Sequence, residues 1–199
     1  PDTAIADILA AEVPVKVTVF IAASLDGYIA RQDGDVSWLH DPAHIDEGVD
    51  YGFNTLLTSV DALVMGRKSF EKVLTFGDWP YGGTRVIVLS SQGVEIPAPL
   101  RDRVESANKA PADLCITLGR QGLNHIYIDG GLTVQRFLRE GLVTDLIITR
   151  IPRLLGKGVP LFGALDAETA LRHVSTTAYP KGLVTSHYCI GSADTPMTS

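Results

Sequence analysis

Arg67, Lys68 and Ser69 follow Gly66 directly after an apolar run, and this grouping suits the binding of phosphate. A guanidinium donates paired hydrogen bonds to phosphate oxygens, an ammonium adds a compact positive charge, and a hydroxyl adds a further donor. If a helix begins at this point, its free backbone N–H groups and partial positive charge also favour an anion. The alternative is a tight turn that carries solvated basic residues.

Two further corners of the chain carry residues that could accept a phosphate. Ser90 and Ser91 follow an apolar segment, where their hydroxyls could bind phosphate or cap a turn. Gly130 and Gly131 follow another apolar run, and glycines there let a pyrophosphate approach the backbone closely. The pair does not form the G-x-G-x-x-G fingerprint, so a purely steric requirement of the turn is the alternative.

Alternating strands and helices must position these corners. Short runs rich in β-branched and aliphatic residues predict strands at 16–22, 61–65, 85–89, 125–128 and 145–149. Asp41 and Pro42 predict a helix start, and apolar residues three or four apart carry that helix forward at Ile45, Val49, Phe53, Leu56 and Val60. Further helices are predicted at 67–74, at 111–121, and from Gly130 to a C-cap at Gly141.

The end of the chain follows a different pattern. Extended segments at 171–179 and 183–190 flank Pro180–Gly182, which predicts a hairpin. Strand–helix alternation predicts a parallel sheet, and the hairpin adds antiparallel strands at its edge. The fold class is therefore α/β with a mixed, mostly parallel sheet and a C-terminal antiparallel hairpin. Ligands of such sheets bind beyond the carboxyl ends of the strands, where the three corners lie.

Composition limits the classes of function. The 199 residues suggest a single domain over 15–191, with an N-terminal extension (1–14) that has short-helix character and a polar tail (192–199). The net charge of −6 argues against a nucleic-acid surface, and no apolar run is long enough to cross a membrane. We expect a soluble, cytoplasmic protein without a secretory signal.

Cysteine and histidine spacing predicts neither a disulfide framework nor a metal site. The two cysteines, Cys115 and Cys189, lie in no C-x-x-C pair and are expected to be reduced and mostly buried. His40 and His44 are four residues apart, but they straddle the predicted helix start.

Taken jointly and in this order, the motifs resemble a family. The chain is similar to the dihydrofolate reductase fold, and more closely to the reductase half of the bacterial riboflavin-biosynthesis deaminase-reductase. The resemblance covers about residues 16–190. It is carried by Ala22–Ala30, Trp38-Leu39, Asp61–Glu71, Val88–Ser91, Ile128–Gly131 and the Leu-Gly-x-Gly-x-Pro-Leu-Phe segment at Leu155–Phe162.

This resemblance implies an NADPH-dependent reductase with a three-layer α/β fold. It assigns the nicotinamide to Ala23, Ile29 and Ala30. The adenosine side and its 2′-phosphate fall to Gly66, Arg67, Lys68, Ser69, Leu89, Ser90 and Ser91. The pyrophosphate falls to Ile128, Gly130, Gly131, Leu132 and Thr133. The residues themselves agree, because an arginine beside a serine pair suits a 2′-phosphate that NAD lacks.

The resemblance also places a proton donor on the first long helix. Counting back from Gly66 by the family's separation reaches Asp50, with Thr149 as a supporting hydroxyl and Asp26 as a further catalytic residue. Such a donor should lie in an apolar cleft, where burial raises its pKa. A solvated acidic helix face is the alternative for Asp50. Substrate contacts are expected from Trp38, Asp46 and Phe53, although Trp38 could simply close a hydrophobic flap.

Departures from the family pattern leave the substrate open. Asp129 stands where the riboflavin enzyme has glutamate, and the zinc-deaminase signature is absent, so no deaminase half is expected. The first hypothesis is a reductase of the 5-amino-6-(5-phosphoribosylamino)uracil type, acting on a pyrimidine- or pteridine-like molecule. The alternatives are a dihydrofolate reductase and a non-catalytic NADPH-binding or nucleotide-binding module. Edge strands suggest a homodimer.

Overall fold

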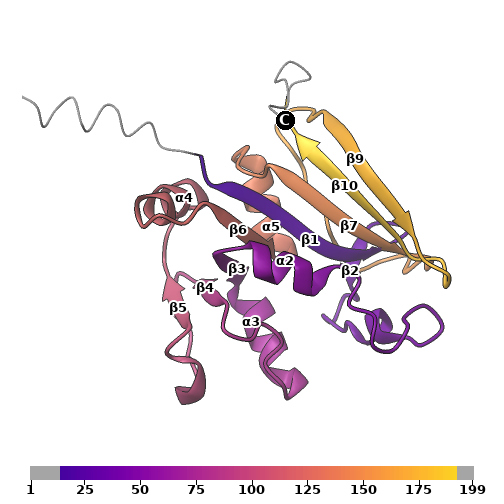
Figure 1. Ribbon diagram of the computed structural model, residues 1–199, viewed down its shortest axis with the longest axis horizontal. Helices are drawn as coiled ribbons and strands as arrows, with labels where there is room; N and C mark the ends of the chain where they lie inside the picture. The colour runs from indigo at the N-terminus through magenta and orange to yellow at the C-terminus, as the bar shows by residue number, and fades with distance from the viewer. Residues whose placement is uncertain (1–13, 192–199) are drawn as a thin grey trace, which may run out of the picture.

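An eight-stranded sheet crosses the protein in the computed structural model, which describes residues 14–191 (Figure 1). Its strand order is β5-β4-β3-β6-β1-β7-β10-β9. The five predicted strands are confirmed, and so is the hairpin. The five predicted strands are β1 (Lys16–Ser24), β3 (Ala62–Gly66), β4 (Arg85–Leu89), β6 (His125–Asp129) and β7 (Asp145–Ile151), and the hairpin strands are β9 (Leu171–Ala178) and β10 (Val184–Ile190).

The sheet is mixed, as the sequence predicts. The strands from β5 (Val104–Ala107) to β7 run parallel, whereas β10 pairs antiparallel with both β7 and β9. Three short strands escaped prediction: β5, β2 (Tyr28–Ala30) and β8 (Val159–Pro160). The pair formed by β2 and β8 is a separate two-stranded sheet. These segments are too short to show a hydrophobic period.

Helices cover both faces of the sheet, giving three layers. On one face, α2 (Phe53–Ser59) and α3 (Arg67–Val73) contribute Leu56, Phe70 and Val73 to a core with Leu63 and Met65. On the other face, α4 (Pro111–Arg120) and α5 (Gly131–Arg139) pack Leu114, Leu118, Val134 and Phe137 against the alternate strand residues. Such alternation follows from the two-residue period of strands.

The helix predicted from residue 42 to residue 60 is wrong in extent. Only 53–59 are helical, because Gly48, Tyr51 and Gly52 have positive φ angles that a right-handed helix excludes. Asp41 does accept a hydrogen bond from the N–H of Ala43 (2.9 Å), but it closes a turn there. Residues 31–52, hereafter loop 31–52, include one short 3₁₀ helix, Ser37–His40.

Loop 31–52 lies beneath the turn of the β9–β10 hairpin (Figure 1). Lys181 in that turn donates to the carbonyls of Pro42 and Ile45 and pairs with Asp46 (2.8 Å). Trp38 packs below them with Ile151 and Leu183 in a third cluster. The hairpin therefore holds loop 31–52 against the sheet.

Two further 3₁₀ turns lie at Leu74–Phe76 and Ala98–Leu100. Within the residues that the structure describes, no helix is long and apolar enough to cross a membrane. The short helix expected within residues 1–14 and the polar tail lie almost wholly outside the described part of the chain.

Candidate functional site

The corners after β3 and β6 meet at the carboxyl edge of the sheet. A Cβ atom added to Gly66 would lie 2.9 Å from the Thr133 hydroxyl oxygen. One added to Gly130 would lie 2.3 Å from the Ser69 hydroxyl oxygen, and Gly130 also has a φ of +91°. Both glycines are therefore required by the close approach of α3 to α5. The structure brings together four residues that the sequence assigned to one cofactor.

The β2–β8 pair closes a second side of this corner. A Cβ atom on Gly131 would lie 2.8 Å from Ile29, and one on Gly158 would lie 2.3 Å from the Ala30 carbonyl oxygen. Ile29, predicted to line the nicotinamide, thus lies against the first residue of α5. Gly131 is buried there, so a glycine is required by the close packing of α5 against the β2–β8 pair.

Arg67 reaches toward the turn that follows β4. Its guanidinium donates to the Gln92 side chain (3.1 Å) and lies 3.7 Å from Glu71. The Ser90 hydroxyl donates to the Gly93 carbonyl (2.8 Å), so it caps its own turn, while Ser91 is exposed. Arginine and the two serines therefore stand at neighbouring corners, as the strand order requires.

The other predicted cofactor residues differ in how far they are exposed. Lys68 and Leu132 are exposed, and Leu89 is half-buried. Ala23, Ala30 and Ile128 are buried, with Ile128 fully inside the core that α5 covers. Because the Ile128 side chain lies in this core, only its backbone could contact a ligand. The sequence alone did not show this burial.

An aromatic cluster lies beside this corner on the α2 face. Phe53 at the start of α2 contacts Phe20 and Tyr81, each at 6.2 Å between ring centroids. Phe20 also meets Tyr127 edge-on, and Tyr81 meets Trp79 at 5.1 Å. Tyr81 and Tyr127 are buried, whereas Phe20 and Phe53 are half-buried, so these two phenylalanine rings provide the apolar surface that could contact a flat heterocycle. Phe53, predicted to contact substrate, belongs to this cluster.

Asp129 is the carboxyl group whose environment fits a proton donor. It ends β6, directly before Gly130, and accepts the Gly130 N–H (2.8 Å). Burial raises its pKa to about 6, although the Gly130 hydrogen bond opposes the rise. Burial raises the pKa of both Tyr81 and Tyr127, and the nearby Asp129 carboxylate raises both further. From the sequence, Asp129 stands out only as a departure from the family pattern.

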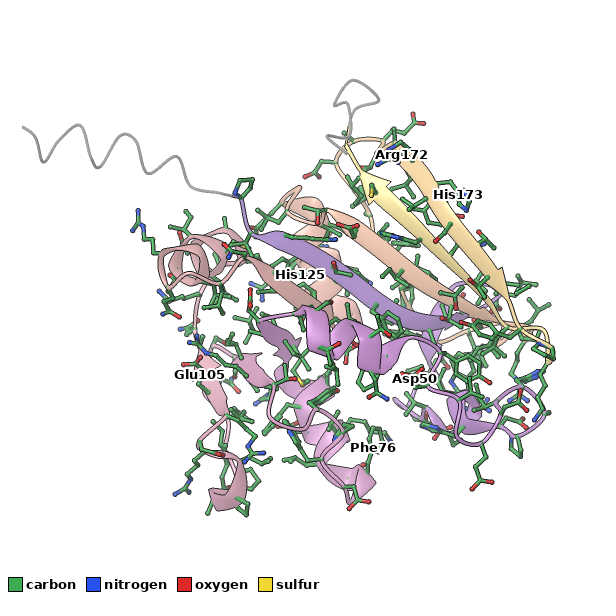
Figure 2. The ribbon with its side chains drawn as sticks, in the orientation of Figure 1. Asp50, Phe76, Glu105, His125, Arg172 and His173 are labelled. Carbon is green, nitrogen blue, oxygen red and sulfur yellow. The ribbon has the colours of Figure 1, made fainter. Side chains whose placement is uncertain are left out.

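Asp50 lies in a different environment from the apolar cleft predicted for it. It is exposed at the start of α2, where its oxygens accept the N–H groups of Gly52 (3.1 Å) and Asn54 (2.9 Å) (Figure 2). These hydrogen bonds lower its pKa. Asp50 lies two residues before Gly52, the N-cap of α2, and its carboxylate binds backbone N–H groups there. Its lowered pKa keeps it ionised at neutral pH, so its predicted role as proton donor remains a prediction that this geometry does not favour.

Asp26 and Thr149 both have structural partners. The Asp26 carboxylate accepts the Ser24 hydroxyl (2.6 Å) and the N–H groups of Leu155 and Gly156 (2.7 Å for the latter). These bonds, led by that from Ser24, lower its pKa and fasten the β1–β2 turn to the segment before β8. Thr149 bonds the Thr185 hydroxyl (2.7 Å) on β10. No hydrogen bond joins Asp50 to Thr149 in the described chain.

The other two residues that were predicted to contact substrate lie in loop 31–52. Asp46 is half-buried and paired with Lys181, so its carboxylate is already engaged. Trp38 is 2 % exposed, which leaves no ring face for stacking and agrees with a flap-closing role. Its indole N–H is buried without a hydrogen-bond partner in the described structure.

Parallel strands, two covering helical layers, a terminal antiparallel hairpin and a glycine-built corner define an α/β protein of the dihydrofolate reductase-like fold. The chain belongs to the RibD C-terminal domain family, which residues 15–185 match. The similarity to the riboflavin deaminase-reductase family expected from the motifs is thereby confirmed.

Relatives agree with this assignment. The uncharacterized protein YwjB of Bacillus subtilis is 34% identical over 177 residues, which cover 87% of this chain and 97% of YwjB. The dihydrofolate reductase HdrB of Haloferax volcanii is 28% identical over 136 residues, or 67% of this chain and 64% of HdrB.

Among solved structures, a Shewanella sp. PV-4 protein described as a riboflavin biosynthesis protein is 41% identical, with a TM-score of 0.84. The match covers 89% of this chain and 100% of that one. Dihydrofolate reductase from Enterococcus faecalis has a TM-score of 0.59 at 15% identity, covering 89% of this chain and 97% of that one, which supports the fold alone.

Proposed function

We propose that this protein is an NADPH-dependent reductase of the riboflavin-biosynthesis type, acting on a pyrimidine- or pteridine-like small molecule. The observation that carries the proposal is the corner built by Gly66, Gly130 and Gly131, where an added Cβ would meet another residue. Family membership and the dihydrofolate reductase-like fold support it. The Enterococcus relative of that fold is complexed with NADP(H).

The residues present fit such a cofactor, because the half-buried Gly130 and the exposed Leu132 lie at the start of α5 and Arg67 stands beside the serine turn. Gly130, Gly131, Leu132 and Thr133 would hold the pyrophosphate, and Gly66 to Ser69 with Ser90 and Ser91 would hold the adenosine 2′-phosphate. Ala23, Ile29 and Ala30 would border the nicotinamide. When bound, the cofactor supplies the hydride.

The chain's own contribution is to orient a flat substrate and to supply a proton. The rings of Phe20 and Phe53 would hold the heterocycle, and Asp129 would donate the proton from its carboxyl oxygen. A pKa of about 6 leaves part of that carboxyl protonated near neutral pH, whereas Asp50 would be ionised.

Cofactor choice tests this proposal at one residue. We expect Arg67→Ala to weaken NADPH binding about tenfold while leaving NADH binding unchanged, since only NADPH offers the 2′-phosphate. Calorimetric titration of both cofactors measures this. Arg85→Ala is the matched control, because Arg85 pairs with Glu105 at the opposite end of β4. Equal affinities of the wild-type protein for NADPH and NADH would contradict the assignment.

Turnover separates the remaining alternatives. The expected result is NADPH oxidation with the ribosylaminopyrimidinone phosphate as substrate. Oxidation with dihydrofolate alone would make the protein a dihydrofolate reductase, for which its similarity to HdrB is the supporting observation. Tight NADPH binding without turnover of either compound would support a binding module instead.

We further propose that residues 15–191 form one reductase domain and that the protein acts in the cytoplasm. The two cysteines are free thiols, which suits a reducing compartment.

A further inference from the structure

Three metal-ligating side chains of different types meet at one end of the β7–β10 ladder. Asp145 begins β7, and Cys189 lies directly opposite it on β10 in the antiparallel register. His187 lies two residues earlier on β10 and points to the same face. One ligand atom from each of the three lies within 4.8 Å of the others. His187 and Cys189 are two residues apart, whereas Asp145 lies 42 positions before His187, so the sequence spacing alone does not indicate the cluster.

Several donors converge on the Asp145 carboxylate. His187 Nε2 donates to Oδ1 at 2.8 Å, Cys189 Sγ donates to the same oxygen at 3.6 Å, and Lys16 Nζ lies 3.6 Å from it. The Thr144 hydroxyl donates to Oδ2 (2.7 Å). Although burial raises the pKa of Asp145, the bonds from Thr144 and His187 and the Lys16 charge lower it overall. The carboxylate is thus an acceptor, so His187 carries its proton on Nε2.

We propose that Asp145, His187 and Cys189 bind a divalent transition-metal ion of the zinc class. Imidazole nitrogen, thiolate sulfur and carboxylate oxygen are the donor atoms that Zn²⁺ uses in proteins. On binding, the Cys189 thiol loses its proton to solvent, and the His187 proton moves from Nε2 to Nδ1. The ion takes the place of the N–H and S–H protons that now converge on Oδ1.

The fold gives the site rigid support and an entry path. All three ligands stand on paired strands, whose register fixes their separation, and Thr144 orients the carboxylate from behind. A hollow of about 180 Å³ between α2 and strands β1 and β7 opens onto Asp145 and His187. Three protein ligands leave a fourth position for water or a small ligand from this hollow.

The three ligands lie at the opposite end of β7 from the proposed reductase corner, and the hollow beside them shares Phe20 with the aromatic cluster. Asp145 and Thr149 are four residues apart on β7, about 13 Å along the strand, and the corner lies beyond the Thr149 end. Nearby cations have opposite effects. Burial and the neighbouring Asp145 carboxylate raise the pKa of the Cys189 thiol, and the positive charges of Lys16 and of Arg172, opposite Cys189 on β9, only partly oppose this rise (Figure 2). Lys16 competes directly with a metal ion for Asp145, but its side chain is half exposed and can turn away.

Cobalt spectroscopy tests the proposal, because Co²⁺ takes zinc sites and reports its ligands. Adding one equivalent of Co²⁺ to the reduced wild-type protein should give a near-ultraviolet thiolate-to-cobalt band and intense visible bands of tetrahedral cobalt, and Zn²⁺ should abolish both. Cys189→Ser should lose the thiolate band. The matched control Cys115→Ser, which alters the free cysteine of α4, should keep it.

Two further variants keep the test sharp if Cys189→Ser fails to fold. His187→Asn should weaken cobalt binding at least tenfold, and Lys16→Met should tighten it about threefold by removing the competing charge. Absence of a thiolate band in the folded wild-type protein would overturn the proposal. So would a band that survives in Cys189→Ser or disappears in Cys115→Ser. None of these readouts depends on reductase activity.

Discussion

At the residue scale, two aspartates illustrate how local contacts decide the protonation of a carboxyl group. Asp50 accepts two backbone N–H groups at the surface, and its pKa falls. Asp129 accepts only one backbone N–H, and burial raises its pKa to about 6. Only Asp129 is partly protonated near neutral pH. The two candidate proton donors therefore predict different pH profiles for turnover.

Turnover should therefore depend on pH through Asp129. As the pH rises above about 6, the protonated fraction of a donor with this pKa falls about tenfold per unit, and turnover should fall with it. Asp129→Asn should lower turnover about a hundredfold and remove this dependence. Asp50→Asn is the comparison and should keep the wild-type profile. A profile that disappears in Asp50→Asn instead would return the role to Asp50.

The same raised pKa has a consequence for stability. Asp129 has a folded pKa of about 6 against an ordinary value of 3.8, so the unfolded state releases its proton first as pH rises. The penalty is absent below about pH 4, develops between pH 4 and 6, and then stays constant at about 3 kcal/mol at most. Asp129→Asn should thus be more stable than wild type at pH 8 but not at pH 4. Urea unfolding at both values checks this, and an equal difference at both would contradict it.

Some of these residues could be predicted from the sequence, and others could not. Gly130 and Gly131 were predictable because a glycine pair between strand and helix has few other uses. The raised pKa of Asp129 was not predictable, because it depends on burial beside Tyr81, which lies 48 positions earlier and reaches the site only through the fold. The exposure of Asp50 was not predictable either, because counting along a motif gives a position in the sequence but not its burial.

At the scale of elements, the parallel strands were predictable because buried strands read as continuous apolar runs. The helix before β3 was not, since a helical stripe in the sequence continues through glycines whose φ angles end the helix. The chain between β2 and α2 is held mainly by contacts distant in sequence. Arg153 pairs with Asp41, and Lys181 bridges three groups of loop 31–52.

We expect Lys181→Met to loosen loop 31–52. The variant removes the ion pair with Asp46 and two hydrogen bonds to carbonyls, but the methionine keeps most of the apolar stem of the lysine side chain. Because these groups are partly exposed, the loss should be about 1 kcal/mol, seen as a roughly fivefold faster amide exchange within loop 31–52. Hydrogen exchange read by mass spectrometry measures it. Lys72→Met on α3 is the control, and equal exchange in both variants would contradict the anchoring role.

At the scale of the whole molecule, the two edges of the sheet differ. The β5 edge is four residues long and carries Glu105 paired with Arg85 (Figure 2). The β9 edge has eight residues, all exposed, including Leu171 (46%) and Val174 (44%). A long, weakly charged edge with apolar side chains invites pairing with another strand, whereas charges protect a short one. If the protein forms a homodimer, as its edge strands suggest, we therefore expect β9 to form the interface.

We predict that the protein is a dimer at micromolar concentration and that Val174→Lys makes it monomeric. A lysine on this edge would place like charges near one another across the two-fold axis and would replace apolar surface that the partner buries. Light scattering coupled to size exclusion gives the mass directly. Ser106→Lys, on the β5 edge, is the matched control and should remain dimeric. A monomeric wild-type protein, or a dimer that survives Val174→Lys but not Ser106→Lys, would show that β9 does not form the interface.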